Sequence, residues 1–293
     1  MTNDHQVEPT KTHRGENFPV ASLVIDRRHR GIILDFYRFV RAADDIADHP
    51  TLAANEKLAR LDDLEHALLG QRDDVAVAFP LRKSLSERGL SPRHAQDLLT
   101  AFRMDVTKLR YSDWDDLIGY CTYSAMPVGR FVLDVHGESK ATWPASDALC
   151  AALQIINHLQ DCGADYKNID RVYVPLDYLA RHRLSVEALG GNEASPALRA
   201  CITELARRTA ELLKQSKELS AQTRNLRLAL EISIIQRLAE TLVEVLKQRD
   251  PLSQRVHLNK AETFGVSLAA MIATLGSRAM RRFHGAGRTA QDA

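Results

Sequence analysis

Three aspartates fall within five positions of one amphipathic segment, RAADDIAD, at residues 41–48. Asp44 and Asp48 are four residues apart, so on a helix both carboxylates project from the same face, with Asp45 beside them. Like charges at this spacing destabilise a helix unless a cation lies near them. Carboxylate oxygens suit Mg²⁺, which binds one or two of them together with water and phosphate oxygens. The alternative is an ordinary solvated acidic helix end, and this segment alone does not separate the two interpretations.

A second acidic face favours the metal-binding interpretation. In LQIINHLQDCGAD, residues 153–165, an amide and two carboxylates recur every fourth position, as Asn157, Asp161 and Asp165. Toward the N-terminus the same face continues as Leu153 and Leu149. Carboxylates that merge into an apolar wall indicate a pocket, with a polar mouth for metal and anion and a deeper part for a long apolar group.

Basic and phenolic side chains accompany both acidic faces. Tyr37 and Arg41 share the face of Asp44, while Lys167, Arg171 and Tyr173 follow the second acidic segment. Arginine suits bidentate contact with a phosphate, so we expect Arg171 to act at the site, held in place by the turn at residues 173–175. For Lys167 a surface ion pair is the favoured interpretation.

Between the two acidic segments, small side chains recur at helical spacing. Tyr120, Ser124 and Val128 form one row, with Ala125 and Gly129 beside it. Small residues allow either close packing of helices or room for a ligand chain, and the sequence leaves both interpretations open. Pro127 removes a backbone hydrogen bond, so we expect it to kink or interrupt the helix there.

Helices are expected to position all of these residues. Apolar residues recur at helical spacing along nearly the whole chain, and no segment alternates as a strand would, so the sequence predicts a single all-α domain. Helices are expected at about 28–48, 54–69, 76–88, 92–106, 113–136, 147–167, 195–221, 224–248 and 259–283. Gly70, Gly89 and Gly137 mark helix ends, and Ser91-Pro92 and Asp147 mark helix starts. Residues 168–194 are expected to form the longest irregular connection.

Composition and charge exclude several classes of function. The 293 residues are 45% hydrophobic and 26% charged, and the net charge of +1 gives no support for nucleic-acid binding. Four cysteines without CxxC spacing favour buried thiols in a reducing compartment. The N-terminus lacks the apolar core of a signal peptide, and the longest uncharged run, residues 263–277, is too short to span a membrane. Arg278, Arg281 and Arg282 follow that run, and a solvated helix end is favoured there over contact with an anionic membrane.

The ordered set of motifs resembles the squalene and phytoene synthase family, the head-to-head prenyl synthases. The set lies within residues 14–175, and beyond about residue 190 only the helical character is shared. It consists of Asn17-Phe18, Tyr37-x3-Arg41-x2-Asp44-Asp45-x2-Asp48, Asp105 with Tyr111, Tyr120-Cys121-x3-Ala125-x2-Val128-Gly129, Gln154-x2-Asn157-x3-Asp161-x3-Asp165, and Arg171-Val172-Tyr173-Val174-Pro175. Within the family the chain is most similar to the bacterial branch of hydroxysqualene synthases in hopanoid biosynthesis.

The resemblance implies an isoprenoid synthase fold, a single helical bundle around a central cavity, over residues 14–283. Residues 1–13 and 284–293 are then expected to be flexible. The implied metal ligands for Mg²⁺, with Mn²⁺ as an alternative, are Asp44, Asp48, Asp161 and Asp165, with Asp45 in close support. Arg41, Asn157, Arg171 and Tyr173 are implied to orient a diphosphate, and Tyr37 and Tyr120 to line the cavity. The remaining implied substrate-binding positions are Asn17, Phe18, Ala125, Val128, Gly129 and Gln154.

The reaction implied by this branch is the Mg²⁺-dependent conversion of presqualene diphosphate and water to hydroxysqualene and diphosphate, a carbon–oxygen lyase reaction without a nicotinamide. The chain departs from phytoene synthases at Glu16, at Met126-Pro127 and at Asp170. These departures lie where a second prenyl diphosphate would be held. The alternatives are a prenyltransferase that condenses two prenyl diphosphates to presqualene diphosphate or phytoene, and a non-catalytic helical assembly protein of the same fold.

Partners and location follow from the implied chemistry. A water-insoluble C30 product favours handover at a membrane or to the next pathway enzyme, with the basic end near Arg281 as a candidate contact. We therefore expect a cytoplasmic protein, with peripheral attachment to the inner membrane surface as an option. Monomer and homodimer are both compatible with the sequence, and no nucleic-acid partner is expected.

Overall fold

The computed structural model describes residues 26–289, and this part of the chain contains helices and no β-strand. The α-helices are α1 (Arg27–Ala47), α2 (Ala54–Leu68), α3 (Phe79–Arg88), α4 (Arg93–Thr107), α5 (Trp114–Ser124), α6 (Met126–Val135), α7 (Trp143–Ile169), α8 (Leu176–Arg181), α9 (Pro196–Ser216), α10 (Leu219–Gln222), α11 (Leu226–Gln248) and α12 (Lys260–Thr289). The all-α prediction is confirmed.

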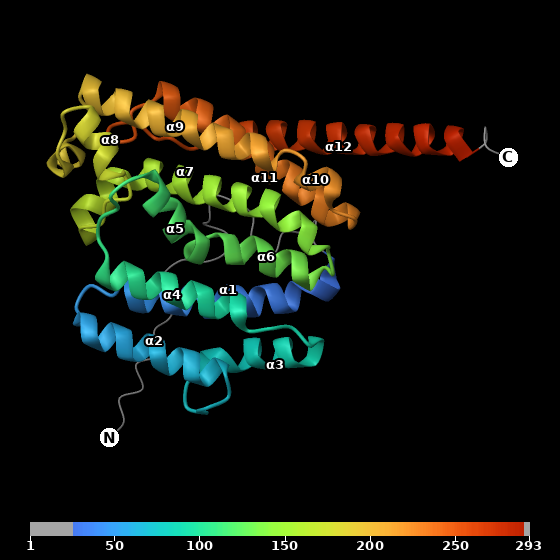
Figure 1. Cartoon of the computed structure of the whole chain (residues 1–293), viewed down its shortest axis with the longest axis horizontal. Helices are drawn as coiled ribbons and strands as arrows, with labels where there is room; N and C mark the ends of the chain where they lie inside the picture. Colours follow the sequence, from blue (N-terminus) through green and yellow to red (C-terminus); the bar gives the residue numbers. More distant parts are fainter. Residues whose placement is uncertain (1–25, 290–293) are drawn as a thin grey trace.

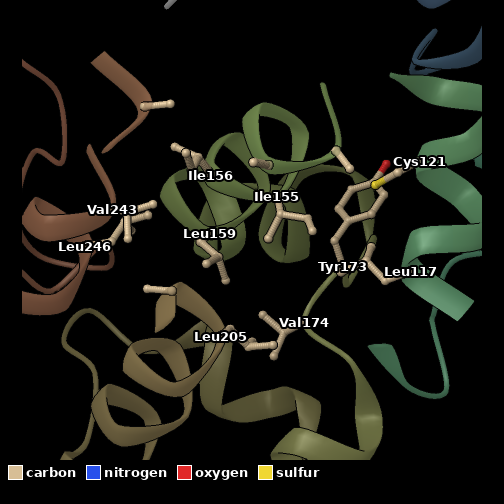
Figure 2. Packing of buried hydrophobic residues seen from close by; sticks show 14 of the residues in the cluster. Leu117, Cys121, Ile155, Ile156, Leu159, Tyr173, Val174, Leu205, Val243 and Leu246 are labelled. Atoms are coloured by element: carbon tan, nitrogen blue, oxygen red, sulfur yellow. The ribbon is translucent and has the colours of Figure 1, made fainter. Parts of the chain in front are cut away.

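The helices stack in layers, with α7 in the middle (Figure 1). One hydrophobic cluster contains residues of α1, α2, α3 and α4 together with Phe131 and Val135 of α6. A larger cluster contains residues of α5, α7, α9 and α11. Figure 2 shows Ile155, Ile156 and Leu159 of α7 between the helices of this larger cluster. Burial of such an aliphatic side chain stabilises the folded state by about 1.5–3 kcal/mol relative to leaving it exposed. The helix that carries the second acidic face is therefore fixed on several sides.

Glycine and proline set most of the helix boundaries as predicted. Gly70, Gly89 and Gly137 have φ of 76°, 62° and 67° at the ends of α2, α3 and α6, a conformation that glycine adopts without steric cost. Pro127 lies in the first turn of α6 and divides the predicted helix 113–136 into α5 and α6. All four cysteines are free thiols, and Cys121, Cys162 and Cys201 are buried.

Several boundaries differ from the prediction. Asp147 does not start a helix, because α7 begins at Trp143 with a proline in its first turn. Asp147 instead accepts two hydrogen bonds from Arg130, at 2.8 and 2.6 Å. The segment 168–194 is not irregular throughout, since it contains α8 and a 3₁₀ turn at Val186–Gly190. The predicted helix 195–221 is divided into α9 and α10, and the last helix continues beyond residue 283 to Thr289. None of the described helices has the length and hydropathy to cross a membrane.

Candidate active site

The two acidic faces meet across one cavity of about 410 Å³. Asp44 and Asp48 reach it from α1, and Asp161 and Asp165 reach it from α7. Each helix presents these residues because its other side is buried: Phe36, Phe39 and Ala43 of α1 pack into the N-terminal cluster, and α7 buries the aliphatic residues of Figure 2. Two carboxylate pairs more than a hundred residues apart in sequence therefore lie on facing walls of one cavity.

Burial and mutual repulsion shift the acidity of this cluster. Burial, together with the nearby Asp48 carboxylate, raises the pKa of Asp44 to about 7. Burial and the neighbouring Asp161 carboxylate likewise raise the pKa of Asp165 to about 7. Near neutral pH the Asp44 and Asp165 carboxyls are therefore only partly ionised, and an added cation would favour their ionised forms.

Arg41 is bound within its own helix by two of the three aspartates. It contacts Asp44 Oδ2 at 2.8 Å and Asp45 Oδ1 at 2.7 Å. Arg41 and Asp44 line the cavity, whereas Asp45 is buried and is not part of the cavity wall. The structure thus separates the predicted triplet: Asp44 and Asp48 face the cavity, and Asp45 binds Arg41. The predicted metal-supporting role of Asp45 stays a prediction.

Arg171 links the ends of the two acidic helices. Its Nη1 donates to Asp48 Oδ1 at 2.6 Å, its Nε to the Asp105 carbonyl at 3.1 Å and its Nη2 to the Ala47 carbonyl at 3.4 Å. The residue follows directly on α7, after Asp170 at a left-handed φ of 52°. The side chain is buried and lines the cavity, and its predicted contact with a diphosphate stays a prediction.

Asp105 of α4 is a central residue of the site that the sequence reasoning did not include among the site residues. The Tyr120 hydroxyl donates to its Oδ2 at 3.0 Å, and the Tyr173 hydroxyl donates to its Oδ1 at 2.9 Å. Burial raises the pKa of Asp105 to about 6 although these donors and Arg171 oppose the shift. Since each tyrosine has a single O–H, both protons are directed at Asp105. In this arrangement the Tyr173 hydroxyl proton is directed at Asp105 rather than at a ligand in the cavity.

His158 is the second residue that sequence reasoning missed. It lines the cavity, stacks on Tyr173 with ring centroids 3.5 Å apart, and lies 3.0 Å from the Gln154 amide nitrogen. Burial, with the nearby Arg171 charge, lowers the pKa of His158 to about 3, so the imidazole is neutral at physiological pH. The only sequence signal for His158 is its place beside Asn157 within the second acidic motif.

Some of the remaining predicted residues line the cavity, and others lie outside its wall. Tyr37, Val128, Gln154 and Asn157 line the cavity together with Phe102, Ser124 and Ile169. Ala125 is buried outside its wall. Lys167 donates to the Gly191 carbonyl at 2.9 Å, on the surface. Asn17 and Phe18 lie outside the described residues.

A second, almost wholly apolar cavity of about 290 Å³ adjoins the first. Tyr37, Val40 and Val128 line both cavities, so the polar site and the apolar one lie side by side with these three side chains between them. The apolar wall includes Leu149 and Leu153, which the sequence placed on the same face as the aspartates. Gly129 also lines it, and a Cβ at this position would collide with Ser146 Oγ and Cys150 Sγ. Gly129 thus serves both interpretations, close helix packing and space for a ligand chain.

The residues present fit Mg²⁺ as a shared rather than a fully protein-held ion. Within residues 26–289, no three His, Cys, Asp or Glu side chains converge to hold a metal by themselves. The two carboxylate pairs nevertheless offer hard oxygen donors on facing walls, and one member of each pair, Asp44 and Asp165, has a raised pKa. Mg²⁺ typically takes one or two carboxylates and completes its coordination with water and substrate phosphate, which this arrangement allows.

Two carboxylate-bearing helices facing each other over a cavity with an apolar extension, inside an all-α bundle, form the architecture of the isoprenoid synthases. The sequence profile of the squalene/phytoene synthase family matches residues 11–262, and the chain belongs to this family. The match extends well past residue 175, where the resemblance of the motifs ended.

Individual relatives agree with this placement. A protein of Rhodopseudomonas palustris named hydroxysqualene synthase is 56% identical, over 98% of this chain and 97% of its own length. A protein of Sinorhizobium fredii with the same name is 54% identical, over 96% of this chain and 97% of its own length. Among solved structures, a squalene synthase from Alicyclobacillus acidocaldarius has a TM-score of 0.71 at 29% identity, covering 78% of this chain and 87% of its own.

Proposed function

We propose that the protein converts presqualene diphosphate and water to hydroxysqualene and diphosphate, a step of squalene and hopanoid biosynthesis. The observation that carries this proposal is that a carboxylate-lined cavity adjoins an apolar cavity, with Tyr37, Val40 and Val128 lining both. One substrate with a diphosphate head and long hydrocarbon chains would occupy both. Identities of 54–56% over nearly the full length of relatives named hydroxysqualene synthase support this choice of reaction.

The first step breaks the bond between carbon and the diphosphate oxygen. The leaving diphosphate takes the electron pair and leaves a cyclopropylcarbinyl cation. Mg²⁺ bound by Asp44, Asp48, Asp161 and Asp165 would neutralise charge on the leaving oxygens. Arg41, Asn157 and Arg171 line the same cavity and would orient the diphosphate. Arg171 retains N–H donors beyond its bonds to Asp48, Asp105 and Ala47, because a guanidinium carries five.

The second step is rearrangement of the cation and its capture by water. The oxygen of water forms the new bond to carbon and one proton is released, so no reductant is consumed. The aromatic side chains of Tyr37 and Tyr120 line the cavity, and their rings would stabilise a cation near them. The neutral His158 adds no positive charge that would oppose the cation. Apolar walls beyond Val40 and Val128 would limit early attack by water.

The proposal is tested by the products of purified protein with Mg²⁺ in water enriched in oxygen-18. Added presqualene diphosphate should give hydroxysqualene carrying the heavy isotope, and farnesyl diphosphate alone should give little product. Substantial presqualene diphosphate from farnesyl diphosphate alone would instead favour the condensing prenyltransferase. No turnover of either substrate would favour the non-catalytic alternative, which the presence of all four cavity aspartates argues against.

A further inference from the structure

The last helix, α12, carries an apolar face that no described residue covers. Phe264, Leu268, Ile272 and Leu275 recur at helical spacing, and 69%, 43%, 63% and 47% of these side chains are exposed. No charged residue interrupts the helix between Thr263 and Ser277. Single exposed apolar residues are ordinary, but a continuous row on one helix marks a contact surface. We define the outer face of α12 as these four residues.

The opposite side of α12 is firmly attached to the bundle. Ala270 packs against Ile234 and Leu238 of α11, and Thr274 Oγ1 donates to Ser233 Oγ at 2.6 Å. Arg278 Nη2 donates to the Ser220 carbonyl of α10 at 2.8 Å. Figure 1 shows the C-terminal part of α12 projecting beyond the other helices. The outer face is therefore held in a fixed orientation, and none of the residues that the structure describes packs over it.

Charge along α12 indicates the chemistry of the missing partner. The helix carries Lys260, Arg278, Arg281, Arg282 and Arg288 against a single acid, Glu262. This excess is concentrated here, because the whole chain has a net charge of only +1. A row of Phe, Leu and Ile flanked by basic residues, with low net hydropathy, is typical of a helix that lies in the interface of an anionic bilayer. A second copy packed in parallel on this face would bring the two basic C-terminal ends together.

We propose that the outer face of α12 inserts in-plane into the surface of an anionic lipid bilayer. Bulky side chains at 264, 268, 272 and 275 would enter the boundary between headgroups and acyl chains, and the net positive charge of the helix would attract anionic lipid headgroups. On its other side α12 packs on α11, whose Ile232 and Ile235 line the apolar cavity. The bilayer would thus lie one helix away from the wall of that cavity. The inference rests on α12 and is independent of which product the enzyme forms.

Vesicle sedimentation with matched variants tests this surface. The variant Leu268→Glu/Leu275→Glu places two charges on the outer face of α12. The control Leu176→Glu/Leu226→Glu makes the same change on α8 and α11, where the exposed fractions are 39% and 43%. Wild type and control should sediment with vesicles of equal parts phosphatidylglycerol and phosphatidylcholine. The affinity of the outer-face variant for these vesicles should be lower by about tenfold or more. Vesicles of pure phosphatidylcholine should bind all three proteins weakly.

Circular dichroism and light scattering complete the test. Equal helical signal and equal melting of the two variants would attribute lost binding to the surface rather than to unfolding. Equal loss of binding in both variants would overturn the proposal, since it would reduce the effect to overall charge. Failure of the wild type to bind either kind of vesicle would overturn it as well. A wild-type dimer that the outer-face variant converts to a monomer, without lipid binding, would assign the face to a second copy instead.

Discussion

The Arg171 guanidinium donates to the Asp48 carboxylate at 2.6 Å, although the two residues are 123 positions apart. One lies at the C-terminal cap of α1 and the other directly after α7. The same arginine also binds the carbonyls of Ala47 and Asp105. The ends of both acidic helices are therefore joined through one side chain, which fixes the spacing between the carboxylate pairs before any ligand arrives.

Replacing Arg171 should impair both stability and diphosphate chemistry. Arg171→Lys keeps the positive charge but loses the planar set of donors, so at least two of its three contacts are broken. We expect a loss of about 1–3 kcal/mol in the free energy of unfolding, moderated because Asp48 is partly exposed. Loss of a donor to the leaving group should lower kcat by about 10²-fold or more. Urea unfolding and steady-state release of diphosphate measure the two effects.

A surface ion pair provides the matched control for Arg171. Arg110 binds Asp170 on the exposed side of the same chain turn. Arg110→Lys should change stability by less than about 0.5 kcal/mol and leave kcat unaffected. Equal effects of the two substitutions would contradict a special role for Arg171.

The cavity carboxylates should be required individually. Asp161→Ala should abolish Mg²⁺-dependent release of diphosphate, because it removes one member of the α7 carboxylate pair. Asp62→Asn, on the exposed surface of α2 where Asp62 pairs with Arg103, serves as the control and should leave the rate unchanged. Unchanged release in Asp161→Ala would rule out the site. Product analysis at saturating Mg²⁺ is the measurement.

Sequence periodicity was sufficient for the helices and for the four cavity aspartates, because spacing by four residues is a local property. It was not sufficient for Asp105, a single acid within an otherwise amphipathic helix, whose partners Tyr120 and Tyr173 come from other segments. The apparent helix start at Asp147 failed for a related reason. Its carboxylate accepts hydrogen bonds from Arg130 of another helix, and the local sequence pattern does not predict this contact. The roles of Asp105 and Asp147 depend on contacts between residues far apart in sequence, which local spacing does not predict.

Stability of the metal-free protein should depend on pH through Asp44 and Asp165. Their folded-state pKa of about 7 lies above the ordinary 3.8. The stabilisation that these groups contribute is therefore complete below the ordinary pKa and is lost as the pH rises through about 7. Mg²⁺ with pyrophosphate should raise the melting temperature more at about pH 8 than at about pH 6, because the ligands must be ionised. An equal increase at both pH values, measured by thermal shift, would contradict this assignment, and Asp44→Asn/Asp165→Asn should remove the difference.

Removing the Asp105 carboxylate should disorganise the tyrosines rather than the metal site. In Asp105→Asn one of the two tyrosine hydroxyls faces an amide N–H₂ instead of an acceptor oxygen. We expect a fall in kcat of about tenfold and a larger share of misdirected alcohols or alkenes, because the Tyr120 ring at the cavity wall is no longer held in position by Asp105. Product ratios by gas chromatography distinguish this role from a purely structural one. A slower enzyme with an unchanged product ratio would contradict it.

Gly129 should be intolerant of even one added methyl group. A Cβ there would collide with Ser146 Oγ and Cys150 Sγ of α7, whereas a Cβ at Gly119 of α5 meets nothing within 4 Å. Both glycines lie inside helices, so alanine should improve the helix propensity of each by about 0.5–1 kcal/mol. At Gly129 the collision should outweigh this gain, for a net loss of about 1–2 kcal/mol. Gly119→Ala should be neutral or stabilising. Because Gly129 also lines the apolar cavity, its alanine variant should raise KM for presqualene diphosphate. Thermal unfolding of the two variants measures the effect on packing between α6 and α7. Their steady-state kinetics measure the effect on the space available to the substrate.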